Sequence, residues 1–513
     1  MRLLLFILGV TIAQLSLAVP YEAEVLADNP IRYYRLGEAA GPTAFDSSIP
    51  FHANGTYVNL AASDFLEYGP LIGSPSAAVL LRGSPTNAEV IVPDASDLRL
   101  TGDMTVEFWF KKTAEASDWQ RIVGKGDATH RNYGIWEENG AGQRLLFQQY
   151  NSGSSVLHFF SNSTIPLNVW THVAAVVQGS TGYLYINGVL DATGARSGPP
   201  STSADPLRIG YGQVHTYFPG YVDEVAIYAS ALSGSRIAAH YAARIQPVDY
   251  PQIVVADGAN AYYRFDDPSS ANGSPVADSA DSNPATYLGN VTLIPSGLPG
   301  VPGRAASFNG STSYIRLPVA PFGAYPTSGS TNNYTLSFET WFQTSAGGVI
   351  LAQTNNVAPP SNPGGWVPAI YVDTTGRVRA SIFWHNGTGN QIVTPTAYND
   401  GKWHYLVDVY DQGIEKLYLD GVLIGQQTFA EFAYSGAYAY FLGTGYTGGA
   451  WANGNGTWYY FNGNLDEAAL YPRALDLEHI AWHYALGRQP EPATLVLLGA
   501  GLALLRRRRG TTA

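Results

Sequence analysis

The sequence predicts an all-β protein made of two tandem antiparallel β-sandwich jelly rolls, each with a short closing helix. Three observations support this prediction. Glycine is frequent (55 of 513 residues), aromatic residues reach 13% and charged residues fall to 13%, against a usual charged fraction of ~25%. Short apolar runs with strand-like alternation are separated by turn residues. Most of these runs recur about 232 residues later in the chain, which indicates an internal duplication.

The charge balance and the lack of cysteine exclude several classes of protein. Without cysteine, the chain has no disulfide framework, no Cys-ligated zinc or iron–sulfur site and no thiol catalysis. The formal net charge is −12, which disfavours binding to a phosphate backbone. We therefore expect no nucleic-acid partner.

The first expected element is a secretory signal peptide, residues 1–18. An apolar run from Leu3 to Leu17 ends in Ser16-Leu17-Ala18, whose small residues fit a cleavage site. The run is short for a membrane span, which needs ~20 residues. We expect cleavage and a mature chain that begins at Val19; a retained N-terminal anchor is the alternative.

Strand motifs then follow in the same order in each copy. The dipeptides Asn187-Gly188 and Asp420-Gly421 stand between apolar runs, a pattern typical of β-hairpins. The main repeated motifs are Tyr33-Tyr34-Arg35-Leu36 with Tyr262-Tyr263-Arg264-Phe265, Val106 to Phe110 with Phe338 to Phe342, Leu184 to Leu190 with Leu417 to Leu423, and Asp223 to Tyr228 with Asp466 to Tyr471.

Each copy ends in one helical pattern. Ile237 and Tyr241 share a face at i,i+4 in the first copy, and Ile480 and Tyr484 do so in the second, so a closing helix of about two turns is expected. The predicted domains are residues 21–246 and 250–488. Two prolines in the segment from Gln246 to Pro251 are interpreted as a break between them.

This ordered set of motifs resembles the LamG-like jelly roll of the concanavalin A-like lectin/glucanase superfamily. The second copy departs from the pattern, because Asp266 and Asp267 replace Gly37 and Glu38, and His404 stands one position earlier than His172. The motifs that carry the resemblance are Tyr33 to Glu38, Glu107-x-Trp109-Phe110, Trp170 to Val173, Tyr185 to Gly188, and Gly220 to Tyr228.

The last expected element is a C-terminal signal at residues 490–509. Pro490-Glu491-Pro492 precedes an apolar run, residues 493–505, and then four arginines. This three-part pattern closely resembles the PEP-CTERM sorting signal of exopolysaccharide-producing Gram-negative bacteria. The resemblance implies processing by an exosortase-type enzyme, transient membrane contact through a short transmembrane segment, and sorting to the cell surface. Thirteen helical residues cover only ~20 Å of a ~30 Å hydrocarbon core; a permanent tail anchor is the alternative.

Catalytic patterns are weak in this sequence. Glycoside hydrolysis needs two carboxylates roughly 5–9.5 Å apart in one cleft. The adjacent pairs Asp223-Glu224, Asp466-Glu467 and Glu137-Glu138 lie in predicted strands, where successive side chains point to opposite faces. The Glu-x-Asp-x-x-Glu pattern of the related glucanases does not occur in the chain. We therefore expect a protein that is not an enzyme.

Histidine and aspartate are the candidate metal ligands. His479 and His483 are spaced i,i+4, yet the glutamate of a His-Glu-x-x-His motif is missing, so a packing or capping role is favoured over zinc. Hard oxygen ligands suit Ca²⁺, and the LamG-like resemblance implies that such an ion is often present. Turn capping is the alternative for the first two of the four candidate calcium ligands, which are Asp46, Asp278, Asp223 and Asp466.

Two groups of aromatic residues are distinguished. Trp109, Trp170, Trp341 and Trp403 recur on apolar strands and are expected in the core. The second copy also has a ten-residue insertion between Gly443 and Gly463. Sugar sites pair flat aromatic faces with amide groups, so this loop is a candidate ligand site, with a loop tip that binds nothing as the alternative. The candidate ligand-binding residues are Tyr446, Trp451, Asn453, Asn455 and Trp458.

The expected function is that of an exported, non-catalytic protein of the cell surface or extracellular matrix of a Gram-negative bacterium. It would bind a polysaccharide or glycoconjugate, or mediate adhesion. One alternative is a polysaccharide-degrading enzyme of the concanavalin A-like glucanase superfamily that assembles carboxylates from separate strands. The other is a purely structural matrix component.

Overall fold

The chain forms two compact units in the computed structural model. Unit 1 comprises residues 1–72 and 76–247, and unit 2 comprises residues 73–75 and 248–513. The signal peptide (1–18) and the C-terminal signal (490–509, with 493–505) lie outside the described residues. The structure describes residues 20–50, 53–65, 67–73, 77–115, 117–212, 215–245, 249–323, 334–382, 390–428, 438–448 and 451–488.

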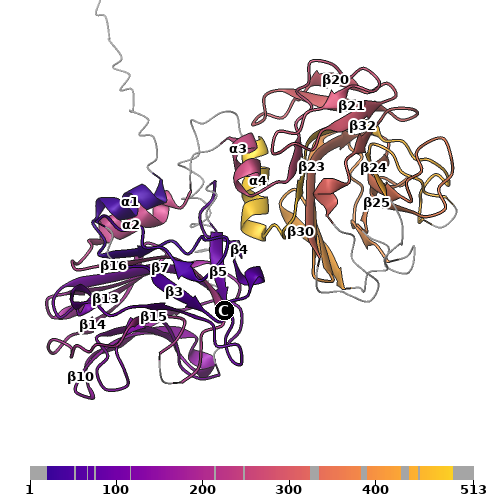
Figure 1. The fold of residues 1–513 in the computed structure, drawn as a ribbon. Helices are drawn as coiled ribbons and strands as arrows, with labels where there is room; N and C mark the ends of the chain where they lie inside the picture. Colours follow the sequence, from indigo (N-terminus) through magenta and orange to yellow (C-terminus); the bar gives the residue numbers. More distant parts are fainter. Residues whose placement is uncertain are drawn as a thin grey trace, which may run out of the picture. The chain divides into compact units, whose positions relative to one another are not determined.

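Unit 1 is built from two eight-stranded antiparallel sheets (Figure 1). The first has the order β14-β13-β12-β7-β16-β5-β4, with β1 paired to β16, and the second has the order β11-β10-β9-β8-β15-β6-β3-β2. The strands are β1 (Arg32–Tyr34), β2 (Thr43–Ala44), β3 (Gly55–Val58), β4 (Glu67–Tyr68), β5 (Ala77–Leu81), β6 (Glu89–Val92), β7 (Met104–Lys112), β8 (Gln120–Lys125), β9 (Tyr133–Glu137), β10 (Arg144–Asn151), β11 (Ser154–Thr164), β12 (Thr171–Gln178), β13 (Thr181–Ile186), β14 (Val189–Ala195), β15 (Leu207–Ile209) and β16 (Gly220–Tyr228).

Unit 2 repeats this architecture. Its sheets have the orders β20-β21-β32-β23-β28-β29-β30, with β17 paired to β32, and β18-β19-β22-β31-β24-β25-β26-β27. The prediction of two all-β sandwiches is therefore confirmed. The strands are β17 (Ala261–Tyr263), β18 (Pro275–Val276), β19 (Ala285–Leu288), β20 (Thr292–Pro295), β21 (Arg304–Asn309), β22 (Tyr314–Leu317), β23 (Thr335–Thr344), β24 (Gly348–Thr354), β25 (Trp366–Val372), β26 (Val378–Ala380), β27 (Ile392–Val393), β28 (Trp403–Asp411), β29 (Ile414–Leu419), β30 (Val422–Thr428), β31 (Ala439–Leu442) and β32 (Asn462–Tyr471).

Among the described residues, each unit carries two α-helices instead of the single closing helix that was expected. The closing helices α2 (Gly234–Ala243) and α4 (Leu477–Arg488) are longer than two turns, with 10 and 12 residues. The opening helices α1 (Tyr21–Ala27) and α3 (Tyr250–Ala256) were not predicted. In Figure 1, α1 lies beside α2 and α3 lies beside α4.

The two units divide between residues 247 and 248, inside the predicted segment, but Pro251 does not interrupt a regular element, because it lies in the first turn of α3. Proline is tolerated there, since the first-turn N–H groups have no partner within the helix. Asp249 caps the helix by accepting the Gln252 N–H at 2.9 Å, and the Gln252 side chain accepts the Asp249 N–H at 3.1 Å. This capping box is a start signal for a helix.

The central strands alternate between two kinds of environment. In β7, Val106, Phe108 and Phe110 join the core between the sheets, whereas Trp109 belongs to a second cluster beneath the helices. Trp109 and its counterpart Trp341 are each 1% exposed, and each stacks on a tyrosine of the closing helix, with ring centroids 5.6 and 5.8 Å apart.

The tryptophan prediction is correct for three residues and wrong for one. Trp170, like Trp109 and Trp341, is buried, whereas Trp403 is partly exposed. Trp403 is the first residue of β28, and the end of a strand is covered less completely than its centre.

A β-bulge interrupts the last long strand at the same place in both units. The register of β16 shifts between Asp223 and Ala226, and Glu224 has φ 53°. In β32, Glu467 has φ 51°. The expectation of simple alternation at the two Asp-Glu pairs was therefore wrong, because a bulge adds one residue and turns the following side chain.

Within the described ranges, no helix is both long and apolar enough to cross a membrane.

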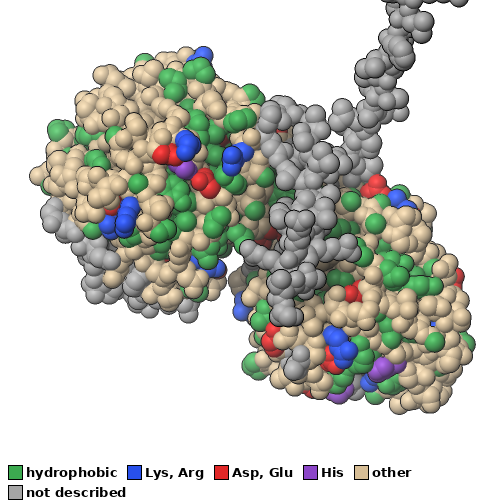
Figure 2. All heavy atoms as spheres, turned by 180° about the vertical axis from the view of Figure 1, so that it is seen from behind, with side chains coloured by type: hydrophobic (Ala, Val, Ile, Leu, Met, Phe, Trp, Pro, Cys, Tyr) green, Lys and Arg blue, Asp and Glu red, His purple; other side chains and the backbone are tan. Residues whose placement is uncertain are grey.

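Charged side chains are also sparse. On the molecular face drawn in Figure 2, basic side chains lie singly or beside acidic ones and form no broad patch.

Candidate functional site

The two tryptophans of the inserted loop are buried. Trp451 is 5% exposed and joins the core of unit 2, and Trp458 is 6% exposed and packs against Phe441 of β31. Contrary to what a sugar site in this loop would need, neither indole offers an exposed face on which a sugar ring could stack. An antiparallel bridge between Tyr446 and Trp458 closes the loop, and the indole N–H of Trp458 donates to the Ser361 carbonyl at 3.1 Å.

The loop amides are mostly used within the protein. Asn455 accepts from the Thr447 hydroxyl at 2.9 Å and donates to the Trp458 carbonyl at 3.1 Å. Asn453 donates to Asp373 at 3.3 Å. Tyr446 is partly exposed and packs edge-on against Trp366, with centroids 5.1 Å apart. Saccharide binding by these residues stays a prediction, which now depends on Tyr446.

The first two candidate calcium ligands cap turns. Asp46 accepts backbone N–H groups from Tyr33 at 3.0 Å, Ser48 at 3.0 Å and Ala53 at 3.2 Å. Asp278 does the same in unit 2, where the donors are Tyr262 at 2.8 Å, Ala280 at 3.0 Å and Asn283 at 3.1 Å. Both oxygens of each carboxylate therefore serve the backbone, as turn capping requires.

The other two candidate calcium ligands lie at the bulges. Asp223 accepts the Glu224 N–H at 2.9 Å, and Asp466 accepts the Glu467 N–H at 2.9 Å and the Ser296 hydroxyl. Among the described residues, no three His, Asp or Glu side chains lie together in a way that could hold a metal ion. The four aspartates do not form a calcium cage in the described structure, and bound calcium stays a prediction.

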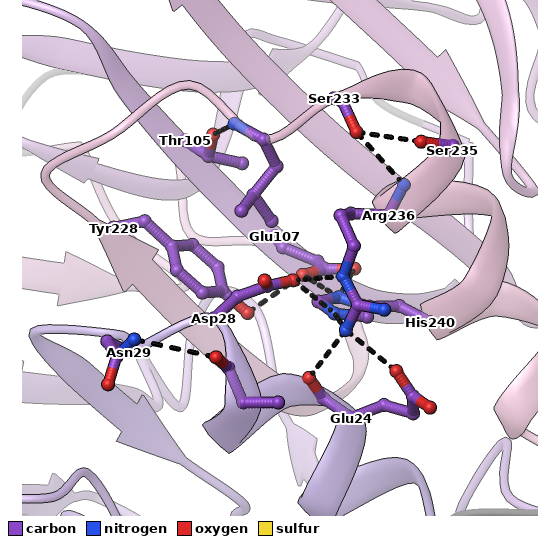
Figure 3. Close-up of polar contacts among 12 residues, drawn as sticks. Glu24, Asp28, Asn29, Thr105, Glu107, Tyr228, Ser233, Ser235, Arg236 and His240 are labelled. Carbon is purple, nitrogen blue, oxygen red and sulfur yellow. Dashed lines mark hydrogen bonds and ion pairs between the residues drawn. The ribbon is translucent and has the colours of Figure 1, made fainter.

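A buried carboxylate–histidine centre lies beneath the helices of unit 1 (Figure 3). Glu107 of β7 contacts His240 Nδ1 at 2.9 Å and His172 Nε2 at 2.8 Å. His240 Nε2 lies 3.0 Å from Asp28, which follows α1. Burial opposes the charge on Glu107, but the two histidines outweigh it and lower its pKa to about 2. The centre thus ties the sheet to both helices.

Unit 2 keeps this centre but exchanges two donors to the glutamate: Tyr405 takes the place of His172, and Tyr250 of α3, at 3.3 Å, takes the place of Tyr228 of β16, at 3.1 Å. Glu339 accepts from His483 Nδ1 at 2.8 Å and from the Tyr405 hydroxyl, and His483 Nε2 lies 2.9 Å from Asp257. Tyr405 replaces His172 because both donate to the equivalent glutamate. Burial lowers the pKa of His483, but Glu339 and Asp257 raise it to about 10. Since Glu107 and Glu339 are 0% exposed, both centres are structural.

The two histidines of α4 have packing roles, as expected. His483 belongs to the buried centre, and His479 Nδ1 lies 2.7 Å from Asp476, just before the helix. In unit 1 the position of His479 is taken by Arg236, which pairs with Asp28 at 2.8 Å and Glu24 at 2.7 Å (Figure 3).

Cationic and aromatic side chains gather on one face of unit 1, which the sequence reasoning did not identify. Arg121 of β8 is paired in register with Trp136 of β9, so both side chains lie on the same face of the sheet. That face points away from the core, because Tyr133 and Ile135, which alternate with Trp136, belong to the core cluster. We call the set Arg121, Arg131, Arg208, Trp136 and Tyr150 the arginine face.

The arginine face is held together by cation–π contacts. The guanidinium carbons of Arg121 and Arg131 lie 5.5 and 5.1 Å from the Trp136 ring centroid. Arg131 also lies 4.6 Å from the centroid of Tyr150. Arg121 and Trp136 are buried, at 0% and 1% exposure, whereas Arg131, Tyr150 and Arg208 are partly exposed.

Glycines shape the floor of this face. A Cβ atom added at Gly134 would lie 2.6 Å from the Trp136 indole nitrogen, and one at Gly212 would lie 2.5 Å from the same ring. Because such distances are below contact distance, only glycine lets Trp136 lie this close to the backbone.

Unit 2 has an apolar cluster where unit 1 has the arginine face. Val349 of β24 is paired with Tyr371 of β25, in the positions that Arg121 and Trp136 occupy in unit 1. These two residues pack with Ala352 and Tyr459. The Tyr371 hydroxyl donates to the carbonyl of Ala452 at 2.7 Å, so the inserted loop contacts this face.

A depression of about 730 Å³ lies on unit 2 beside α3. Its wall includes Arg264, Asp266 and Pro302. Arg264 is already paired with Asp266 at 3.2 Å and with the buried Glu467 at 3.4 Å. Arg264 and Asp266 are therefore neutralised within the protein, and the third charged group of the lining, Asp249, caps α3. None of the predicted site residues lines this depression.

The carboxylates considered for hydrolysis are engaged within the protein, and all of them except the partly exposed Glu138 are buried. Glu224 accepts from the Tyr33 hydroxyl and from Arg35 at 3.3 Å. Burial raises the pKa of Glu224 and raises that of Glu467 further. Glu137 pairs with the buried Lys112 at 2.9 Å.

The comparisons with known proteins assign the family. Residues 84–238 and 309–481, more than half of the chain, match the family model described as the concanavalin A-like lectin/glucanases superfamily. The chain belongs to this family. The predicted LamG-like, concanavalin A-like fold is thus confirmed in both copies. A search among curated proteins found no match.

Several solved structures resemble the chain, with low sequence identities and low TM-scores. Domain 4 of AbnA, a GH43 extracellular arabinanase from Geobacillus stearothermophilus, in complex with arabinotriose, has 21% identity, a TM-score of 0.30 and coverage of 42% of this chain and 98% of that chain. The Trypanosoma rangeli sialidase has 13% identity and a TM-score of 0.32, and 42% of this chain matches 32% of it. The binding domain of Botulinum neurotoxin DC in complex with SialylT has 13% identity, a TM-score of 0.34, and coverage of 86% and 94%. Scores this low do not assign a ligand or an activity.

Proposed function

We propose that this protein is an exported, non-catalytic carbohydrate-binding or adhesion protein of the bacterial surface or extracellular matrix. The arginine face of unit 1 carries the proposal. The partly exposed Arg131 lies over the ring of the buried Trp136 there and also over the ring of the partly exposed Tyr150. Carbohydrate sites commonly combine aromatic surfaces with a few fixed polar groups.

The non-catalytic part of the proposal is supported by the carboxylates. Glu224 and Glu467 are 0% and 1% exposed, and a polymer substrate would have to reach them through the packed interior. Export is supported by the sequence signals at residues 1–18 and 490–509, with an exosortase-type enzyme as the processing partner.

One experiment tests binding against catalysis. The purified protein is run through native gels that contain individual neutral and acidic polysaccharides, with and without a calcium chelator, and the same mixtures are assayed for new reducing ends. We expect retarded migration without release of reducing ends. Release of reducing ends would establish a glycan-degrading enzyme, and free migration in every gel would favour a structural matrix component. Loss of retardation with the chelator would support bound calcium.

Mass spectrometry of the protein from its native host tests the export signals. The expected N-terminus is Val19, and no peptide should contain Arg506 to Arg509. Recovery of the intact arginine tail in the outer membrane or the medium would contradict the sorting hypothesis.

A further inference from the structure

The arginine face holds buried donors that the protein leaves unpaired. Arg121 is 0% exposed, and its Nη2 has no hydrogen-bond partner among the described residues; the same is true of the Trp136 indole N–H. The other Arg121 nitrogens donate only to main-chain carbonyls, those of Gly126 at 2.8 Å and Tyr211 at 3.3 Å. A buried cation without a carboxylate is costly, and so is a buried N–H without an acceptor.

The neighbouring arginines add to the uncompensated positive charge around Arg121. Burial, followed by the like charges of Arg131 and Arg208, lowers the pKa of Arg121 to about 9, and Asp205 opposes this only weakly. Among the described residues, Arg131 forms no ion pair, and its guanidinium donates to Gln148. Arg208 is paired with Glu89 at 2.6 Å. The potential at the face is therefore positive although the whole chain carries a net charge of −12.

We infer that the arginine face of unit 1 binds a carboxylate or sulfate group carried by an acidic polysaccharide. Such a group pairs with the partly exposed guanidinium of Arg131. Its negative charge also offsets that of the buried Arg121 without direct contact, because Arg121 and the Trp136 N–H lie beneath the surface. Charge-assisted hydrogen bonds to guanidinium are among the stronger polar contacts in proteins. This inference rests on the proposed function and names the ligand class for the same surface.

A saccharide is favoured over other polyanions by the aromatic groups beside the arginines. Tyr150 is partly exposed next to Arg131, and Phe160, also partly exposed, lies 4.5 Å from the guanidinium of Arg144. Arg144 is already paired with Glu138 at 2.9 Å, so this edge offers ring surface without an unpaired charge. Sugar rings pack on such surfaces, whereas inorganic polyphosphate has no apolar face to place there.

The test is affinity electrophoresis and titration calorimetry of the full chain with four probes: polygalacturonate, dextran sulfate, dextran and polyphosphate. We expect binding to polygalacturonate or dextran sulfate that weakens as NaCl is raised, and none or much weaker binding to dextran. The two acidic polymers distinguish carboxylate from sulfate.

Variants of Arg131 test the site itself. This residue is partly exposed and holds no carboxylate, so Arg131→Gln should fold normally, which a thermal unfolding scan verifies. Arg131→Gln should weaken binding about tenfold, the effect of one lost charge-assisted hydrogen bond, and Arg131→Lys should retain most of it. The matched control Arg316→Gln removes the same charge from an exposed position in the second sheet of unit 2 and should change nothing.

The outcomes separate the two proposals. Equal binding to dextran and polygalacturonate, unaffected by Arg131→Gln, would overturn the inference and leave carbohydrate binding in place. Binding to none of the polysaccharides would overturn both. Tighter binding to polyphosphate than to either acidic polysaccharide would assign the face to phosphate and overturn the inference.

Discussion

Unit 1 and unit 2 share a buried centre and differ on the outward face of the second sheet. Below the helices, Glu107 and Glu339 each contact a histidine of the closing helix, and the other ring nitrogen of that histidine contacts an aspartate. On the outward face, Arg121 of unit 1 has Val349 as its counterpart in unit 2. The two copies therefore share the buried carboxylate–histidine centre and differ in the residues on the outward face of the second sheet.

This difference separates two kinds of charged residue. In the buried centre every carboxylate has a histidine partner, so the centre stabilises the sandwich without needing a ligand, although His172 Nδ1 has no hydrogen-bond partner among the described residues. The arginine face is an open set, because Arg121 and Trp136 keep donors without acceptors. Unpaired indole N–H groups also occur at the core residues Trp109 and Trp341, so the proposed ligand role of the arginine face depends on its cationic side chains.

The largest expected effect comes from breaking the shared centre. Glu107→Gln and Glu339→Gln each leave buried histidines without their carboxylate, and we expect each to lower the free energy of unfolding of its own unit by about 3–5 kcal/mol. Chemical denaturation followed by tryptophan fluorescence measures both. A loss below about 1 kcal/mol in either variant would mean that the centre is not what closes that unit.

The inserted loop of unit 2 gives the next effect. Trp458→Ala removes a buried indole and should destabilise unit 2 by about 3–5 kcal/mol. Tyr446→Ala is the matched change at a partly exposed ring of the same loop and should cost less. If Trp458→Ala instead left the melting temperature unchanged and reduced polysaccharide retention, the loop would be the ligand site and the tryptophan would not be a packing residue.

A smaller effect is a pH dependence in which the two units can be compared. The pKa of His483 rises from 6.5 to about 10 on folding, since Glu339 and Asp257 outweigh burial, and that of His240 is raised as well. A raised folded-state pKa adds stability that is complete below pH 6.5 and is lost as pH rises toward the folded value. We expect the stability of unit 2 to fall between pH 6.5 and about 10. His483→Gln should reduce this dependence and leave the part that comes from His479, whose pKa is raised to about 9 because Asp257 and Asp476 outweigh burial. An unchanged slope would show that His483 does not contribute.

The smallest effect is the exchange of equivalent donors. His172→Tyr in unit 1 and Tyr405→His in unit 2 each keep a donor to the central glutamate, so each should cost less than about 1.5 kcal/mol, as for a shape-tolerated core exchange. Thermal unfolding of the two variants measures this. A loss comparable to that of Glu107→Gln would show that the two donors are not equivalent.

The strands and the duplication were predictable because short apolar runs, turn dipeptides and repeated motifs are visible over a few consecutive residues. The opening helices were missed because seven residues carry little periodicity, although the Asp249–Gln252 capping box was a readable signal. The burial of Trp458 was not readable, because a loop rich in Gly and Asn does not reveal which strand it packs on. The arginine face depends on residues 121, 131, 136, 150 and 208, which only the sheet order brings together.

The contact between Asp28 and His240 also determines when, during synthesis, unit 1 can complete its fold. These residues are 212 positions apart, yet they lie 3.0 Å from each other in the folded unit. The helix that leaves the ribosome first therefore has no docking partner until the whole of unit 1 has been made. Folds dominated by such distant contacts form slowly, and the nascent chain exposes its strands for a long interval before closure. A translocase that accepts only unfolded chains would find unit 1 still open.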